Sequence, residues 1–411
     1  MRIRLLLLLV VSCVVFACEF SRASDLALVG GKIYLSPDEK PIETGLVVVH
    51  QGRIVAVGPS ATVKLPRDAK VIDCRGLVVT AGFWNSHVHI LLPGLLHVEK
   101  LSPEQISSQL QEMLTRWGFT TVFDLASVQA NTNLIRRLME NGKVKGPRIL
   151  TVGEPFWIKT PVYVRDFLEK NDIRMPIVQS ARQATERVRK QVGDGADGIK
   201  IFANSVEADG IVTMPLDLAK AITVEAHRAG KPVFAHVSNR EGIEVALQSG
   251  VDVLAHTTPV TGAWDASLVA RMISAHVALT PTLTLWDSEF KTGSREKFEK
   301  LMNDTAVPQL RAFSEAGGQV LFGTDVGYTQ RFNTTEEFLW MSRAGMTFEQ
   351  ILASLTTSPA ERFGYSQHSG RISNGMDADL VVLGADPKQD VTAFSRVRYT
   401  IRHGMIIYAE K

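Results

Sequence analysis

Two histidines separated by one residue, His87 and His89, are the first residues of this chain that suggest chemistry. They follow the apolar run 78–84, which has the composition of a buried β-strand. Alternate side chains of a strand point to the same face, so the two imidazoles emerge side by side. Neutral imidazole is a common ligand of zinc-type ions, and the pair therefore predicts half of a metal site.

Four further polar residues lie within or at the end of later apolar runs, namely Lys200, His236, His256 and Asp325. Histidines combined with a carboxylate match a zinc-type divalent site. Burial lowers the pKa of a lysine amine, and the neutral amine can react with CO₂ to give an anionic carbamate. A carbamate on Lys200 would bridge two metal ions, which predicts a binuclear centre. If Lys200 is only structural, the centre holds one metal.

The elements that must position these residues are strands alternating with helices. Segments such as 102–117, 180–192, 216–229 and 241–248 have helical spacing. The apolar runs between such segments number eight, at 78–84, 119–125, 148–156, 198–203, 232–237, 251–257, 277–283 and 319–326. Eight strands alternating with helices predict an α/β fold closed into a (β/α)₈ barrel of the TIM type, in which the carboxyl ends of the strands share one rim. An open doubly wound sheet is the alternative, but no Gly-x-Gly-x-x-Gly motif follows the first strand.

Short β segments occupy both ends of the chain outside this region. Residues 24–80 and 366–411 are rich in strand-forming residues broken by Gly, Pro and Asp. Isolated strand edges need partners, so we predict that the two ends pair into a small β-sandwich domain. The barrel is predicted to span residues 81–365.

Residues 1–23 predict an exported protein. A basic start, with Arg2 and Arg4, precedes the apolar run 5–17, which is the layout of a signal peptide. Cleavage before Cys18 would leave a lipoprotein attached to a membrane, whereas cleavage near residue 23 would leave a periplasmic or secreted protein. Cys74 is then the one cysteine certain to persist, which excludes a disulfide framework.

The overall composition is that of an ordinary globular protein. Hydrophobic residues make up 45% of the chain and charged residues 21%, and the formal net charge is +2. The basic residues are spread along the chain, which argues against a nucleic-acid partner and leaves a small-molecule substrate.

Three phrases add a family resemblance to these candidate ligands. They are residues 195–200 (GADGIK), 321–325 (LFGTD) and 375–383 (GMDADLVVL). Together with the ligand positions they resemble the amidohydrolase superfamily, and within it the imidazolonepropionase-like and Xaa-Pro dipeptidase-like enzymes. The resemblance implies hydrolysis of a carbon–nitrogen bond in an amide, cyclic amide or dipeptide-like substrate.

The resemblance also implies a role for each ligand. His87, His89 and Asp325 would hold the more buried of two divalent ions, such as zinc, and His236 with His256 would hold the other. The carbamylated lysine of the fourth run would bridge the ions. A hydroxide between them would attack the amide carbonyl, with Asp325 acting as general base and then as general acid.

The loops after the strands should line the substrate site, and Tyr163 and Arg331 are the substrate-binding candidates. The loop 204–217 has no Tyr, a residue that peptide-cleaving relatives use there, and this counts against a peptide substrate. The alternative activity is that of a mononuclear deaminase or an imidazolonepropionase-type hydrolase. A non-catalytic binding protein on the same fold should have lost ligands, and none is lost here.

Overall fold

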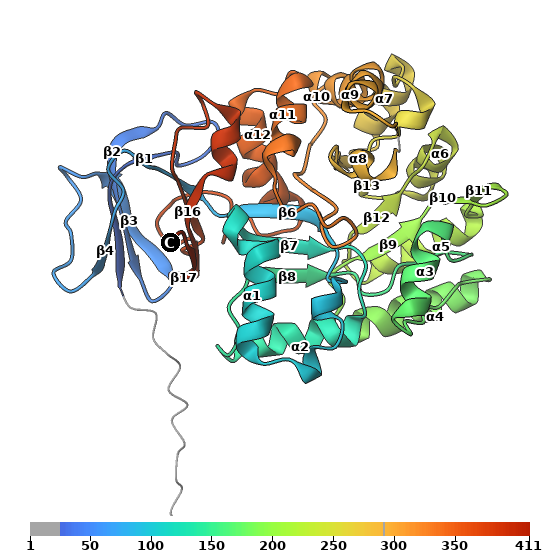
Figure 1. The fold of residues 1–411 in the computed structure, drawn as a ribbon, viewed down its shortest axis with the longest axis horizontal. Helices are drawn as coiled ribbons and strands as arrows, with labels where there is room; N and C mark the ends of the chain where they lie inside the picture. The colour runs from blue at the N-terminus through green and yellow to red at the C-terminus, as the bar shows by residue number, and fades with distance from the viewer. Residues whose placement is uncertain (1–24, 291) are drawn as a thin grey trace, which may run out of the picture.

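The computed structural model describes residues 25–290 and 292–411 as a mixed α/β protein (Figure 1). The predicted signal peptide and Cys18 lie outside the described residues. Among the helices that are described, none has both the length and the apolar character needed to cross a membrane. Figure 1 shows one sheet at the left of the molecule and two parallel sheets, surrounded by helices, in its centre and at its right.

Strands from both ends of the chain build a single sheet of eight strands. Its order is β17-β16-β15-β5-β1-β2-β3, with β4 paired to β1. The antiparallel pairing of β5 with β15 joins the two ends of the chain. The predicted association of the ends is therefore present, but the hydrogen bonds form one sheet, and a sandwich of two facing sheets is not shown. The strands are β1 (Leu26–Ile33), β2 (Ile42–His50), β3 (Arg53–Pro59), β4 (Lys70–Asp73), β5 (Val78–Ala81), β15 (Leu380–Leu383), β16 (Val397–Arg402) and β17 (Met405–Ala409).

The first apolar run of the sequence is divided between two sheets at Gly82. Before it, β5 belongs to the eight-stranded sheet; after it, β6 (Phe83–Val88) pairs in parallel with β7 and carries His87. A Cβ at residue 82 would lie 2.2 Å from Oγ1 of Thr120, so only glycine permits this close crossing between the sheets. The predicted single strand over 78–84 is thus two strands.

Two parallel sheets carry the candidate ligands. The first has the order β6-β7-β8, and the second has the order β14-β13-β12-β9. Isolated parallel bridges link their edges, at Phe156↔Ile201, Leu279↔Val320 and Val88↔Val326. The eighth predicted run, residues 319–326, joins the two sheets through these isolated bridges and is not itself a regular strand. The remaining strands of these sheets are β7 (Phe119–Asp124), β8 (Arg148–Thr151), β9 (Ile199–Phe202), β12 (Val233–His236), β13 (Val253–Ala255) and β14 (Ala278–Thr280).

Helices follow the parallel strands and bury their apolar faces on them. The four predicted helices correspond to α1, α4, α5 and α6, and α1 begins with a capping box in which Ser102 and Gln105 bond reciprocally. A hairpin of β10 (Asn204–Glu207) and β11 (Gly210–Thr213) is inserted between β9 and α5. The helices are α1 (Pro103–Met113), α2 (Gln129–Glu140), α3 (Val162–Lys170), α4 (Ala181–Gly193), α5 (Leu216–Arg228), α6 (Arg240–Ser249), α7 (Ala266–Ser274), α8 (Leu285–Glu289), α9 (Arg295–Asp304), α10 (Ala306–Glu315), α11 (Thr335–Arg343), α12 (Phe348–Leu355) and α13 (Thr357–Arg362), with short 3₁₀ turns η1 (Pro93–Leu95), η2 (Val98–Lys100), η3 (Thr115–Trp117), η4 (Pro259–Thr261) and η5 (Val391–Ser395).

Candidate metal centre and its cavity

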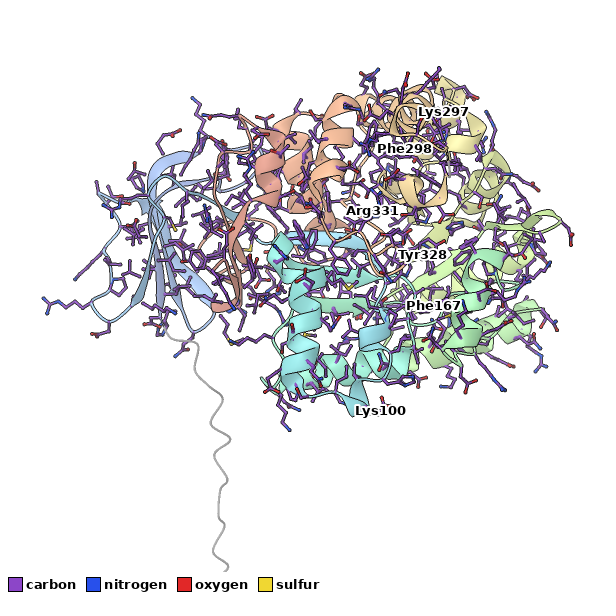
Figure 2. All side chains as sticks on the ribbon, viewed as in Figure 1. Lys100, Phe167, Lys297, Phe298, Tyr328 and Arg331 are labelled. Carbon is purple, nitrogen blue, oxygen red and sulfur yellow. The ribbon has the colours of Figure 1, made fainter. Side chains whose placement is uncertain are left out.

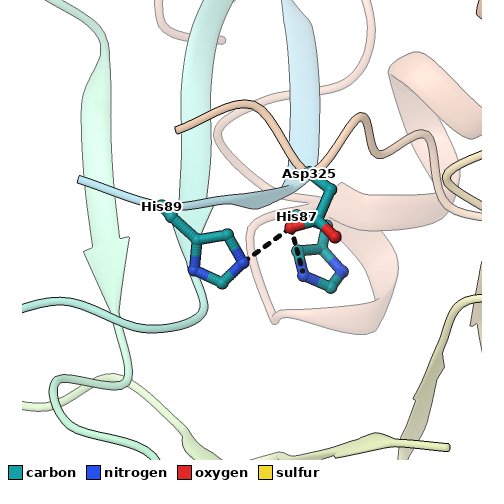
Figure 3. A group of neighbouring side chains, drawn as sticks. All are labelled: His87, His89 and Asp325. Carbon is teal, nitrogen blue, oxygen red and sulfur yellow. Dashed lines mark ion pairs between the residues drawn. The ribbon is translucent and has the colours of Figure 1, made fainter. Parts of the chain in front are cut away.

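His87, His89 and Asp325 form a compact group of ligand atoms (Figure 3). β6 ends just after His87 and before His89, and Asp325 follows the eighth apolar run. Oδ1 of Asp325 lies 2.7 Å from Nε2 of His89 and 3.4 Å from Nε2 of His87. One ligand atom from each of the three residues lies within 4.8 Å of the others, so a single ion could contact all three.

The hydrogen bonding of this group fits a metal site. His87 is 0% exposed, and neither of its ring nitrogens has a hydrogen-bond partner. Oδ1 of Asp325 also lacks a hydrogen bond. Nδ1 of His89 donates to the carbonyl oxygen of Ala126 over 3.2 Å, which directs Nε2 toward the group, as is usual for metal-binding histidines. A buried polar atom without a partner costs about 1–3 kcal/mol, and a cation bound here would remove that penalty.

The other predicted ligands lie beside this group. The ring centroid of His256 is 4.7 Å from that of His87 and 4.9 Å from that of His236. Nδ1 of His256 lies 2.7 Å from Oγ1 of Thr282, so its other ring nitrogen is left for a ligand role. Lys200, on β9, is 1% exposed. All six predicted ligands therefore line one cavity, namely His87, His89, Lys200, His236, His256 and Asp325.

Burial sets the charge states of these groups. It lowers the pKa of Lys200 from 10.5 to about 7, although the nearby carboxylate of Asp325 acts in the opposite direction. Burial also lowers the pKa of His87, His236 and His256 well below 6.5. The three rings are consequently neutral at pH 7, which is the form that binds metals.

The segment that carries Asp325 is held tightly against β6. Asp325 has a φ of 61°, in the left-handed region that residues other than glycine rarely adopt. Gly327 has a φ of 103°, and a Cβ there would lie 1.8 Å from the carbonyl oxygen of His89. Asn85 accepts from the backbone N–H of His87 over 3.2 Å and donates to Oγ1 of Thr324 over 2.8 Å. Backbone strain of this kind is common at functional sites, where the surroundings hold it in place.

A cavity of about 630 Å³ opens above the ligands. This volume is within the range of about 300–1,000 Å³ that is usual for small-molecule sites. The walls come from the segments that follow the strands, and Figure 2 labels two of the lining residues, Phe167 and Tyr328. Aliphatic and aromatic side chains make up most of the walls, and the aromatic ones include Trp157, Tyr163, Phe167, Trp286, Phe290 and Tyr328.

The two predicted substrate-binding residues are placed differently. Tyr163, on α3, lines the cavity, and its hydroxyl lies 3.4 Å from Nε2 of His236. Arg331, labelled in Figure 2, is not among the lining residues. Its guanidinium pairs with Asp287 and, over 3.3 Å, with Glu336. Arg331 therefore has acidic partners of its own.

The sequence interpretation missed several wall residues. Glu289, at the end of α8, accepts a hydrogen bond of 2.7 Å from the hydroxyl of Tyr328. Phe167, Met175 and Phe290 also line the cavity. The available signal was the presence of large apolar residues in the segments after the third and seventh runs.

Comparison with known proteins finds relatives among hydrolases of one family. The model of the amidohydrolase family matches residues 78–407. Ochratoxinase from Aspergillus niger is 22% identical over 90% of this chain and 84% of its own. Imidazolonepropionase from Thermoplasma acidophilum is 22% identical over 94% of this chain and 95% of its own. The crystal structure of a putative prolidase from Bifidobacterium longum superimposes with a TM-score of 0.78 at 25% identity, over 94% of this chain and 95% of the other.

Proposed function

Because the chain belongs to the amidohydrolase family and is therefore a hydrolase, we propose that it cleaves a carbon–nitrogen bond of a small amide, cyclic amide or dipeptide-like molecule with the help of divalent metal ions. The observation that carries this proposal is the buried ring of His87, whose two nitrogens lack hydrogen-bond partners beside the carboxylate of Asp325. A buried group of neutral imidazoles and a carboxylate suits zinc.

The six lining ligands divide into two sets and a bridge. One ion would be held by His87, His89 and Asp325, and the second by His236 and His256. The amine of the lysine on β9 would carry a carbamate between them, and its pKa of about 7 supports this because half of the amine is then neutral at pH 7.

Bound in these two sets, the ions would polarise the scissile carbonyl and activate water for attack. The carboxylate of Asp325 takes the proton from the attacking water and passes it to the leaving nitrogen. The hydroxyl of Tyr163, 3.4 Å from Nε2 of His236, would donate a hydrogen bond to the carbonyl oxygen as negative charge develops on it.

A closed (β/α)₈ barrel is the scaffold of this proposal. Isolated bridges support a closed circle. They join Phe156, which follows β8, to β9, and they join the eighth run to β14 and to β6. The histidines and Asp325 would then lie at the carboxyl ends of the strands, where such barrels carry their chemistry, and Lys200 would lie within β9.

A mononuclear deaminase or imidazolonepropionase-type hydrolase is the second candidate. The observation that favours it is the compact group itself, because His87, His89 and Asp325 are sufficient to hold one ion without the neighbouring residues. In that case the lysine would have only a structural role. The number of metal ions bound per chain separates the two mechanisms.

The test combines elemental analysis with a hydrolysis screen of amides, cyclic amides, dipeptides and esters. We expect the metal-loaded protein to release an amine or ammonia from at least one substrate, and His87→Ala to lose both metal and turnover. His368→Asn, at an exposed histidine outside the cavity, is the matched control and should retain both. Metal-loaded protein without turnover on the whole panel would contradict the proposal and favour a binding protein.

A further inference from the structure

Apolar side chains cover the cavity walls and continue to its mouth. Trp157 packs edge-on against Phe202 with centroids 5.2 Å apart, and Trp286 stacks on Phe290 at 5.5 Å. Val206, on the inserted hairpin, is 46% exposed although it lines the same cavity. The cavity therefore offers ring faces and aliphatic surface from its mouth to the metal ligands, which suits an aromatic or aliphatic group.

The nearby cations are paired outside the cavity. Lys159 and Arg165 both approach Glu207, at 3.6 Å and 3.2 Å, and the side chain of Glu207 is 1% exposed. Neither cation is a lining residue, and Arg331 has its own acidic partners. Within the part of the chain that the structure describes, Lys200 is the one Lys or Arg that lines the cavity, and it lies among the metal ligands.

The charged wall residue is instead a carboxylate. Glu289 lines the cavity, and the hydroxyl of Tyr328 fixes its position by donating to it. The ring of Tyr328 in turn contacts that of Tyr163 edge-on, with centroids 5.9 Å apart. A substrate carboxylate that lies against the apolar walls, away from the proposed metal ions, would therefore meet the carboxylate of Glu289. Among the described lining residues outside the metal ligands, no Lys or Arg is present to pair with it. Burial of an unpaired charge among like charges is strongly unfavourable.

We propose that the substrate is an uncharged amide with a bulky aromatic or aliphatic group, and that Glu289 is the specificity-determining residue that rejects molecules with a carboxylate near the scissile bond. This inference rests on the proposed C–N hydrolysis and narrows its substrate class. It separates this chain from enzymes that recognise the free carboxyl end of a dipeptide or N-acyl amino acid.

Three matched probes test the inference on the metal-loaded protein. N-(2-phenylethyl)benzamide and N-benzoylphenylalanine differ only in the carboxylate beside the amide nitrogen, and N-benzoylphenylalaninamide restores the bulk without the charge. Binding is measured by quenching of tryptophan fluorescence, since Trp157 and Trp286 line the cavity, and turnover by release of benzoate. We expect both neutral probes to exceed the carboxylate by at least tenfold in affinity and in kcat/KM, which is about 1.4 kcal/mol.

Failure of this inference differs from failure of the proposed function. Turnover with equal or better use of N-benzoylphenylalanine would overturn the inference and leave C–N hydrolysis standing. Tenfold discrimination in binding without turnover of any amide would support the inference on the cavity and overturn the proposed hydrolysis.

Variants identify the residue responsible. Glu289→Gln should reduce the discrimination against the carboxylate to below threefold, whereas Glu296→Gln, at an exposed residue on α9 outside the cavity, should leave it unchanged. Unaltered discrimination in Glu289→Gln would overturn the role of Glu289. Lys291 follows Phe290 in the sequence and lies outside the described residues, so Lys291→Gln is included. A preference for the carboxylate that disappears in Lys291→Gln would overturn the proposal.

Discussion

Replacement of Lys200 with Met separates a bridging lysine from a structural one. Methionine keeps an unbranched side chain on β9 but removes the amine. Because burial lowers the pKa of Lys200 to about 7, about half of the amine is neutral at pH 7, against roughly 3 in 10,000 for a lysine at 10.5. The neutral amine is the form that reacts with CO₂, so the wild-type side chain is prepared for a carbamate at physiological pH.

The assay counts metal ions after reconstitution. Metal-stripped wild-type and Lys200→Met proteins are loaded with zinc, in CO₂-free buffer and in buffer with bicarbonate, and analysed for zinc per chain. We expect wild-type protein to bind two ions with bicarbonate and about one without it, and Lys200→Met to bind at most one in both buffers. Two ions in the variant, or a wild-type protein indifferent to bicarbonate, would refute the carbamate bridge and favour the mononuclear mechanism.

The same substitution has a pH-dependent effect on the metal-free protein. The folded pKa of Lys200, about 7, is below the unfolded value of 10.5, so this residue contributes stability that is present above pH 10.5 and is lost as the pH falls through 7. The lost free energy is of the order of 4 kcal/mol at pH 7 and about 2 kcal/mol at pH 9. Urea unfolding should therefore show Lys200→Met more stable than wild type at pH 7, by a margin that shrinks with rising pH. A margin independent of pH would show that the amine is not desolvated.

Three further substitutions test the cavity and its supports. Gly327→Ala should lower the free energy of unfolding in urea by more than about 3 kcal/mol, because its Cβ would meet the carbonyl oxygen of His89 at 1.8 Å. The control Gly142→Ala, at a position with positive φ but no neighbour within 4 Å, should lower it by only about 1–2 kcal/mol. Equal losses in the two variants would contradict the steric argument. Burial raises the pKa of Glu337 from 4.5 to about 7. Its contribution to the free energy of unfolding is therefore full below pH 4.5 and is lost as the pH rises through 7. Urea titrations should show a loss of about 3 kcal/mol over this range, and Glu337→Gln should not show it. Tyr163→Phe should reduce kcat about 100-fold with little change in KM, and a change confined to KM would assign the hydroxyl to ground-state binding.

The gathering of the candidate ligands around one cavity could be predicted because it depends on local rules. The alternation of side chains along a strand places His87 and His89 on one face, and the end of each apolar run is visible in the sequence. His236 and His256 follow the same rule on neighbouring strands. Parallel strands then bring these ends together, so no long-range contact had to be known.

Other features depend on contacts that the sequence does not display. The run 78–84 is continuously apolar, and its division at Gly82 follows from two competing partners, β15 and β7, that are far apart in the chain. Arg331 has the right chemistry for a substrate carboxylate, but Asp287 and Glu336 neutralise it in the folded chain. Glu289 enters the cavity through the placement of α8, which no periodic pattern predicts.

The placement of α8 itself depends on a residue outside the cavity. Glu337, on α11, accepts hydrogen bonds from the backbone N–H groups of Leu283 and Thr284 and from Oγ1 of Thr284, immediately before α8 begins. A buried carboxylate that binds three donors is costly to remove, so Glu337 fixes the start of α8. The same segment reaches the candidate ligands, because the ring of Trp286 packs edge-on against that of His256 with centroids 6.1 Å apart, and its Nε1 donates to Oγ1 of Thr257 over 2.9 Å. Glu337 therefore holds a segment that contacts both the cavity wall at Glu289 and the candidate ligand His256.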